Sequence, residues 1–84
     1  MKASIELSMY PLDKNYVEYI SKYIDRLKSY SDIEVNSNTM STQIFGDYDR
    51  LMEILTNENK RAMIENPPMV IVSKLINADL RPNK

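Results

Sequence analysis

The chain has 84 residues and a formal net charge of -1, from 11 basic and 12 acidic side chains. This balance gives no strong field for a phosphate backbone or an anionic lipid surface, so we expect neither a nucleic-acid nor a membrane partner. The chain contains no cysteine or histidine, which excludes disulfides, thiolate nucleophiles and the commonest metal ligands and general bases. No apolar run approaches the roughly 20 residues of a membrane-spanning helix. We expect one soluble, cytoplasmic domain over residues 1–84, without a metal or cofactor.

The first predicted element is a strand from Ala3 to Tyr10, in which apolar and polar residues alternate until Pro11. Successive side chains of a strand point to opposite faces, so one face is apolar. The other face carries the carboxylate of Glu6 and the hydroxyl of Ser8. This polar face is either a solvated sheet surface or a place where a ligand binds.

Hydrophobic spacing and turn residues predict the remaining elements. They are, in chain order, a helix over residues 15–29, strands over 33–38 and 41–45 that form a hairpin, a helix from Asp47, and a strand over 69–76. The second helix either continues past Asn57 and Asn59 to Met63 or breaks there. Residues 80–84 are expected to be a frayed tail.

This order of elements predicts the ferredoxin-like βαββαβ fold, an α+β architecture with a four-stranded antiparallel sheet and two helices on one face. The other face of the sheet, here called the open face, must meet water, a ligand or another subunit. The last strand is apolar on both of its faces, which indicates that the open face is partly covered. A second copy of the chain would cover it.

A polar segment occupies residues 36–43, where amides and hydroxyls able to donate and accept hydrogen bonds are concentrated. Turn chemistry explains these residues as well as ligand binding does, because Asn and Ser are common in hairpins. The side chains of this hairpin that alternation places on the open face are Glu34, Asn36, Ser41, Gln43 and Phe45.

Two motifs resemble those of a known family. One is Ser8-Met9-Tyr10-Pro11-Leu12 at the end of the first strand, and the other is the S-T-x-I-x-G-D passage over residues 41–47. Together they resemble the YkoF-related family of thiamine- and hydroxymethylpyrimidine-binding proteins, over about residues 3–78. The resemblance implies a ferredoxin-like domain whose open face packs on a second sheet, with the ligand held near that face. A homodimer or dimer of dimers would supply the second sheet, and the role would be to sequester or hand over a vitamin precursor.

The leading hypothesis is therefore a non-catalytic binding protein for thiamine or its hydroxymethylpyrimidine moiety. Hydroxyls, amides and one carboxylate suit an aminopyrimidine, and Glu6 would pair with a protonated ring nitrogen or compensate a thiazolium. No Gly-rich loop or cluster of basic residues is present to hold a diphosphate. Thr42 enters the site through the motif alone, because alternation turns it toward the helices. The predicted ligand-binding residues are Glu6, Ser8, Tyr10, Asn36, Asn38, Ser41, Thr42 and Gln43.

Other classes fit this sequence less well. A ligand-sensing regulatory domain of the ACT type, or an accessory subunit of an unidentified enzyme, shares the topology but needs a catalytic partner. An acylphosphatase needs an arginine just after the first strand, and none occurs before Arg26. An RNA-binding sheet needs paired aromatic and basic residues that the third strand lacks. We predict no catalytic residues.

Overall fold

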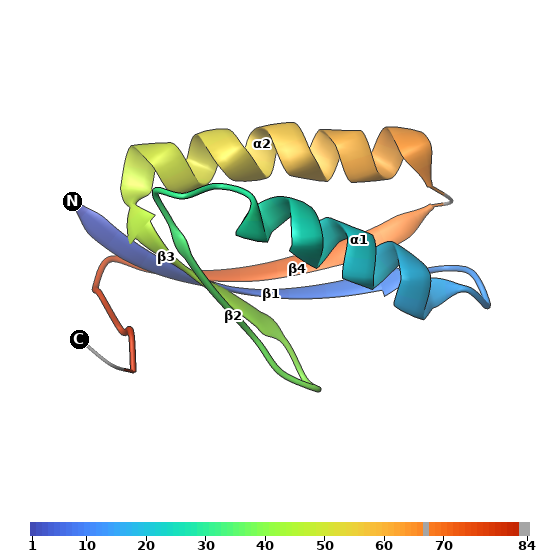
Figure 1. Ribbon diagram of the computed structural model, residues 1–84, viewed down its shortest axis with the longest axis horizontal. Coiled ribbons are helices and arrows are strands. Elements are labelled where there is room, and N and C mark those ends of the chain that lie inside the picture. Colours follow the sequence, from blue (N-terminus) through green and yellow to red (C-terminus); the bar gives the residue numbers. More distant parts are fainter. Residues whose placement is uncertain (67, 83–84) are drawn as a thin grey trace.

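The computed structural model describes residues 1–66 and 68–82 (Figure 1). Its elements are β1 (Lys2–Pro11), α1 (Tyr16–Lys28), β2 (Glu34–Ser37), β3 (Thr42–Asp47), α2 (Tyr48–Glu65) and β4 (Met69–Ile76). The strands form one antiparallel sheet of order β2-β3-β1-β4, and both helices cover the same face of it (Figure 1). The predicted ferredoxin-like α+β fold is confirmed.

Strand β1 is central, and its two neighbours pair with it over different lengths. It pairs with β3 only as far as Leu7 and Thr42, but with β4 as far as Pro11 and Met69. The difference arises because β1 has ten residues and β3 has six. The last four residues of β1 therefore have a strand neighbour on one side only.

The core lies between the helices and the apolar face of the sheet. The alternation of β1 is confirmed, because Ala3, Ile5 and Leu7 are buried. The fully buried aliphatic side chains of the helices and β3 each stabilise the fold by about 1.5–3 kcal/mol. The buried cluster consists of Ala3, Ile5, Leu7, Tyr23, Leu27, Ile44, Leu51, Ile54, Leu55 and Ala62.

Helix α2 is continuous over 18 residues, so the alternative of a break at Asn57 and Asn59 is wrong. The polar side chains in the middle of α2 form hydrogen bonds with two tyrosines, one on α1 and one just after it, and these bonds hold the helix together there. The Tyr23 hydroxyl donates to Asn59 Oδ1 at 2.5 Å, and the Tyr30 hydroxyl donates to Glu58 Oε2 at 2.5 Å. Within residues 1–66 and 68–82, no helix is long and apolar enough to cross a membrane.

The chain after β4 returns across the open face of the sheet. Ser4 Oγ donates to the Ala78 carbonyl at 2.7 Å and accepts from the Leu80 N–H at 2.9 Å. Leu80 and the buried Phe45 line one cavity there. The prediction of a frayed tail is therefore wrong for Leu80 and Arg81, because the Leu80 N–H donates to Ser4 Oγ and the Arg81 N–H donates to Asp79 Oδ1. Residues 83–84 lie outside the described part of the chain.

Candidate ligand-binding site

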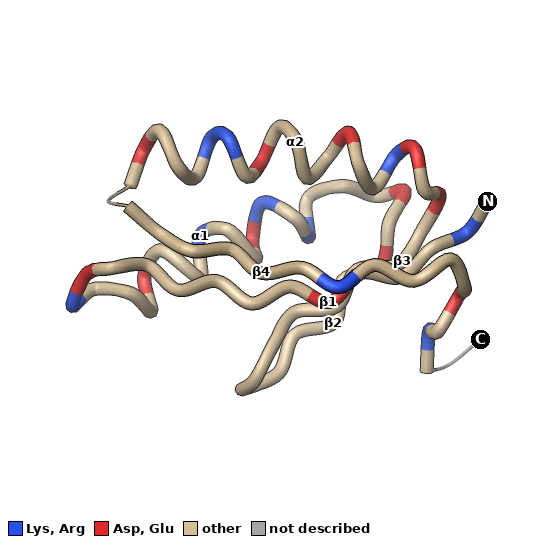
Figure 2. Tube along the Cα trace, turned by 180° about the vertical axis from the view of Figure 1, so that it is seen from behind, with Lys and Arg blue, Asp and Glu red and all other residues tan. Residues whose placement is uncertain are grey.

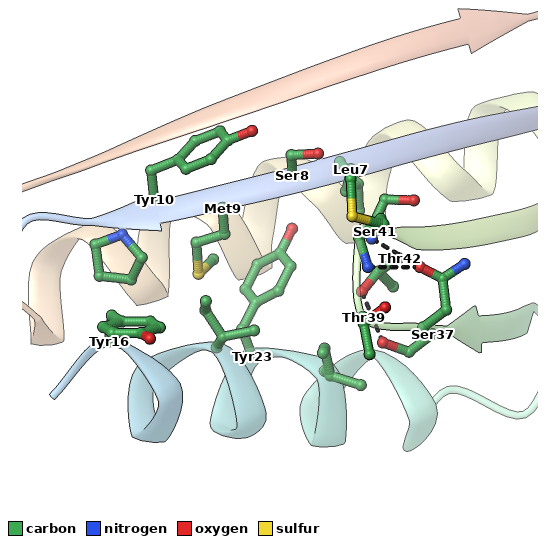
Figure 3. Close-up of a pocket in the computed structure, with 15 residues that line it drawn as sticks. Leu7, Ser8, Met9, Tyr10, Tyr16, Tyr23, Ser37, Thr39, Ser41 and Thr42 are labelled. Carbon is green, nitrogen blue, oxygen red and sulfur yellow. Dashed lines mark hydrogen bonds between the residues drawn. The ribbon is translucent and has the colours of Figure 1, made fainter.

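A cavity of about 330 Å³ lies between the carboxyl end of β1, α1 and the β2–β3 hairpin (Figure 3). We call it the hairpin pocket. It forms because β3 leaves β1 after the pair of Leu7 and Thr42, while β1 continues to Pro11. Its volume is at the lower end of the range of roughly 300–1,000 Å³ that is typical of small-molecule sites.

One wall of the hairpin pocket is apolar and aromatic. Leu7 and Met9 line it from β1, and Tyr23 projects from α1 toward β1 (Figure 3). Burial and the nearby Glu58 carboxylate raise the pKa of Tyr23 well above its usual range, so its hydroxyl stays neutral. Tyr16 also lines the pocket and is 52% exposed. Its ring is therefore free to stack on a planar ligand.

The opposite wall is the tip of the hairpin, which carries hydroxyls and amides. Asn38 Oδ1 accepts from the N–H groups of Met40 at 2.7 Å and Ser41 at 3.0 Å. The hydroxyls of Ser37 and Thr42 lie 3.1 Å apart and share a hydrogen bond. The turn-chemistry interpretation is thus confirmed for the oxygen of Asn38. In the part of the chain that the structure describes, its amide nitrogen has no hydrogen bond and remains available to a ligand.

The hairpin carries no charged residue between Val35 and Phe45. Charged residues lie mainly on the helices and connecting loops, and the hairpin tip is neutral (Figure 2). The hairpin pocket is therefore suited to an uncharged polar ring rather than to a phosphate.

Glu6 projects from the open face rather than into the hairpin pocket. Its Oε2 accepts from the Ser41 hydroxyl at 3.0 Å, and its Oε1 lies 3.7 Å from the ammonium of Lys74. The carboxylate is thus already held between a hydroxyl and a cation. Because the side chains of Glu6 and Lys74 are 40% and 81% exposed, this ion pair is weak.

A second cavity, of about 270 Å³, lies on the open face. Glu6 and Gln43 line it together with Phe45 and Leu80. Asn36 lines neither cavity, and its amide donates to Glu34 Oε2 at 3.4 Å.

The structure thus divides the eight predicted site residues between two sides of the sheet. Those that line the hairpin pocket are Ser8, Tyr10, Asn38, Ser41 and Thr42. The side chains of Ser8 and Tyr10 lie on the side of β1 away from α1 (Figure 3), so these residues border the pocket at the edge of the strand.

Sequence reasoning did not identify the residues that form the rest of the pocket. They are Leu7, Met9, Pro11, Tyr16, Ile20, Tyr23, Ile24, Ser37, Thr39 and Met40. The usable signal was the unequal length of the predicted first and third strands, which leaves an unpaired segment of the longer one.

Comparison with known proteins identifies the family. The family model described as thiamine-binding protein matches residues 5–84. The chain belongs to the thiamine-binding protein family. The resemblance seen in the two sequence motifs is thereby confirmed, and both motifs border the hairpin pocket. None of the curated proteins compared with the chain matches it.

Several solved structures share this architecture. A Streptococcus pneumoniae protein has a TM-score of 0.84 at 26% identity, over 95% of this chain and 90% of its own. A hypothetical protein of Methanocaldococcus jannascii has a TM-score of 0.78 at 26% identity, over 99% of this chain and 87% of its own. A candidate thiamine biosynthesis/salvage protein of Thermotoga maritima has a TM-score of 0.82 at 12% identity, over 93% and 85%, which shows the same fold.

Proposed function

We propose that this member of the thiamine-binding protein family is a non-catalytic binding protein for thiamine or its hydroxymethylpyrimidine moiety. The observation that carries the proposal is the hairpin pocket, a cavity with an aromatic wall and an uncharged polar rim. Both family motifs contribute to its lining, through residues 8–11 and 41–42. An aminopyrimidine is planar and bears both donors and acceptors, as such a pocket requires.

The lining of the pocket favours the pyrimidine half of the ligand. It contains no lysine or arginine to hold a diphosphate and no carboxylate to pair with a cation. A thiazolium ring would therefore lie at the mouth, where Tyr16 offers an exposed aromatic face. We expect hydroxymethylpyrimidine and unphosphorylated thiamine to bind more tightly than thiamine diphosphate.

The predicted residues have different roles under this proposal. Asn38, Ser41 and Thr42 contact the ligand in the hairpin pocket, whereas Ser8 and Tyr10, whose side chains point away from α1, border the pocket at its edge. Glu6 acts on the ligand indirectly, because it holds the Ser41 hydroxyl. Asn36 and Gln43 do not line the hairpin pocket, so under this proposal they make no contact with the ligand.

A homodimer or dimer of dimers through the open face is part of the proposal. Tyr10, Val70, Val72 and Ile76 are 55%, 49%, 46% and 44% exposed there, which is unusual for residues of this kind on one sheet face. Val72→Lys places a charge in the middle of this surface. Sedimentation is expected to show a multimer for the parent and a smaller species for the variant, and a monomeric parent would refute this part.

Calorimetry with thiamine, hydroxymethylpyrimidine and thiamine diphosphate tests the function directly. Ile20→Trp, which fills the hairpin pocket, is expected to abolish binding, whereas Gln43→Ala on the open face is expected to leave it unchanged. The opposite pattern would place the ligand on the open face. No heat from thiamine or the pyrimidine at millimolar concentration would refute the proposed function.

A further inference from the structure

The main-chain groups of β1 alternate in direction, and two hydrogen bonds show which residues point to which neighbour. The Tyr48 N–H donates to the Met1 carbonyl at 2.9 Å on the β3 side. The Leu12 N–H donates to the Pro68 carbonyl at 3.0 Å on the β4 side. Because a strand residue directs its N–H and C=O to the same side, odd-numbered residues of β1 face β3 and even-numbered residues face β4.

Met9 is the first odd-numbered residue of β1 beyond the last pair with β3, which joins Leu7 and Thr42. The continued register would set Met9 opposite Met40. The Met40 N–H instead donates to Asn38 Oδ1, within the turn of the hairpin. Over residues 1–66 and 68–82, the N–H and C=O of Met9 therefore have no strand partner on this side.

This unpaired edge faces the hairpin pocket, because it points from β1 toward the hairpin, and residues of both line that cavity. Met9 provides a donor and an acceptor side by side, and the next odd-numbered residue, Pro11, adds a carbonyl but no N–H. Main-chain groups in a cavity require a partner, either water or a ligand. A flat ring placed there would lie where further residues of β3 would otherwise run.

We propose that the main chain of Met9 is the recognition edge of the hairpin pocket, which selects planar rings bearing a hydrogen-bond acceptor next to a donor. The 4-aminopyrimidine ring has this arrangement, because its ring nitrogen accepts and its exocyclic amino group donates. The inference rests on the proposed function for the identity of the ligand. The geometry of the edge itself is independent of it.

The first test is amide hydrogen exchange by NMR on the unmodified chain. In the ligand-free protein, the Met9 amide is expected to exchange faster than the Leu7 amide, which is in the ladder. Hydroxymethylpyrimidine is expected to slow exchange at Met9 and to move its amide resonance downfield. An analogue without the 4-amino group is expected to bind at least fivefold more weakly, because it leaves the Met9 carbonyl unpaired.

A pair of variants tests the same edge from the protein side. Met9→Pro removes the N–H, and a strand tolerates proline where that N–H is not in the ladder. It is expected to fold and to bind the pyrimidine at least tenfold more weakly, whereas Met9→Leu, which retains the main chain, is expected to bind as the parent does. If Met9→Pro does not fold, the exchange of the Met9 amide and the affinity of the analogue without the 4-amino group still test whether the main chain of Met9 binds the ring.

The outcomes separate this inference from the proposed function. Binding of hydroxymethylpyrimidine with no protection of Met9, and with equal affinity for the analogue, would refute the recognition edge alone. Protection of Met9 by cytosine or adenine, which carry the same ring edge, without any binding of thiamine or its pyrimidine, would support the edge and refute the proposed function.

Discussion

The hydroxyl of Tyr30 is expected to contribute measurably to stability through a single buried carboxylate. Glu58 is only 4% exposed, and its Oε2 accepts from the Tyr30 hydroxyl at 2.5 Å. Its Oε1 has no hydrogen-bond partner among the residues that the structure describes. Tyr30→Phe would therefore leave a buried carboxylate without a donor from the described chain.

The magnitude follows from this geometry. A hydrogen bond to a charged group contributes about 1.5–3 kcal/mol, and a buried group left unpaired costs a similar amount. We expect Tyr30→Phe to lower the free energy of unfolding by about 2 kcal/mol, which corresponds to a decrease in Tm of roughly 8–16 °C for a domain of this size. The substitution retains the ring that Arg50 covers at 5.3 Å, so it isolates the hydroxyl.

Urea denaturation of four proteins measures this effect as a double-mutant cycle. The proteins are the parent, Tyr30→Phe, Glu58→Met and the double variant. Because Met has no charge to pair, Tyr30→Phe is expected to cost little in the Glu58→Met background. If Tyr30→Phe lowers the free energy of unfolding of the parent by less than about 0.5 kcal/mol, or lowers it equally in the parent and in Glu58→Met, the argument is refuted.

Three further predictions concern pH, the hairpin and the open face. Burial raises the pKa of Tyr23 above that of an unfolded tyrosine, so the contribution of Tyr23 to the free energy of unfolding is full below about pH 10 and is lost as pH rises beyond it. Denaturation as a function of pH should therefore show a smaller alkaline decrease in the free energy of unfolding for Tyr23→Phe than for the parent. Asn38→Ala removes the acceptor for two main-chain N–H groups, and it is expected to cost about 0.5–2 kcal/mol by analogy with helix caps and to weaken pyrimidine binding. Thr39→Ala, at a neighbouring hairpin position, is the matched control for the stability measurement. Glu6→Gln is expected to weaken thiamine binding about twofold and to leave the neutral pyrimidine unchanged, because Lys74 already compensates the carboxylate; calorimetry showing equal losses for both ligands would contradict this.

The fold was predictable because its signals are local. The alternation in β1 and the apolar spacing in α1 each state which face of an element is buried, and the order of elements leaves few topologies. The same alternation correctly turned Thr42 toward the helices, where it is buried and bonded to Ser37. The family motifs then located two of the segments that border the hairpin pocket.

The position of the pocket and the path of the tail required the tertiary structure. The pocket exists because β3 leaves β1 after the pair of Leu7 and Thr42. The unequal lengths of the predicted strands indicate that they separate, but no local pattern states at which pair. The tail is held by Ser4, whose partners Ala78 and Leu80 are 74 and 76 residues away in sequence. The alternation of apolar and polar residues shows on which face of the sheet a side chain lies. Which residue it contacts on that face is determined by the packing of segments that are distant in sequence.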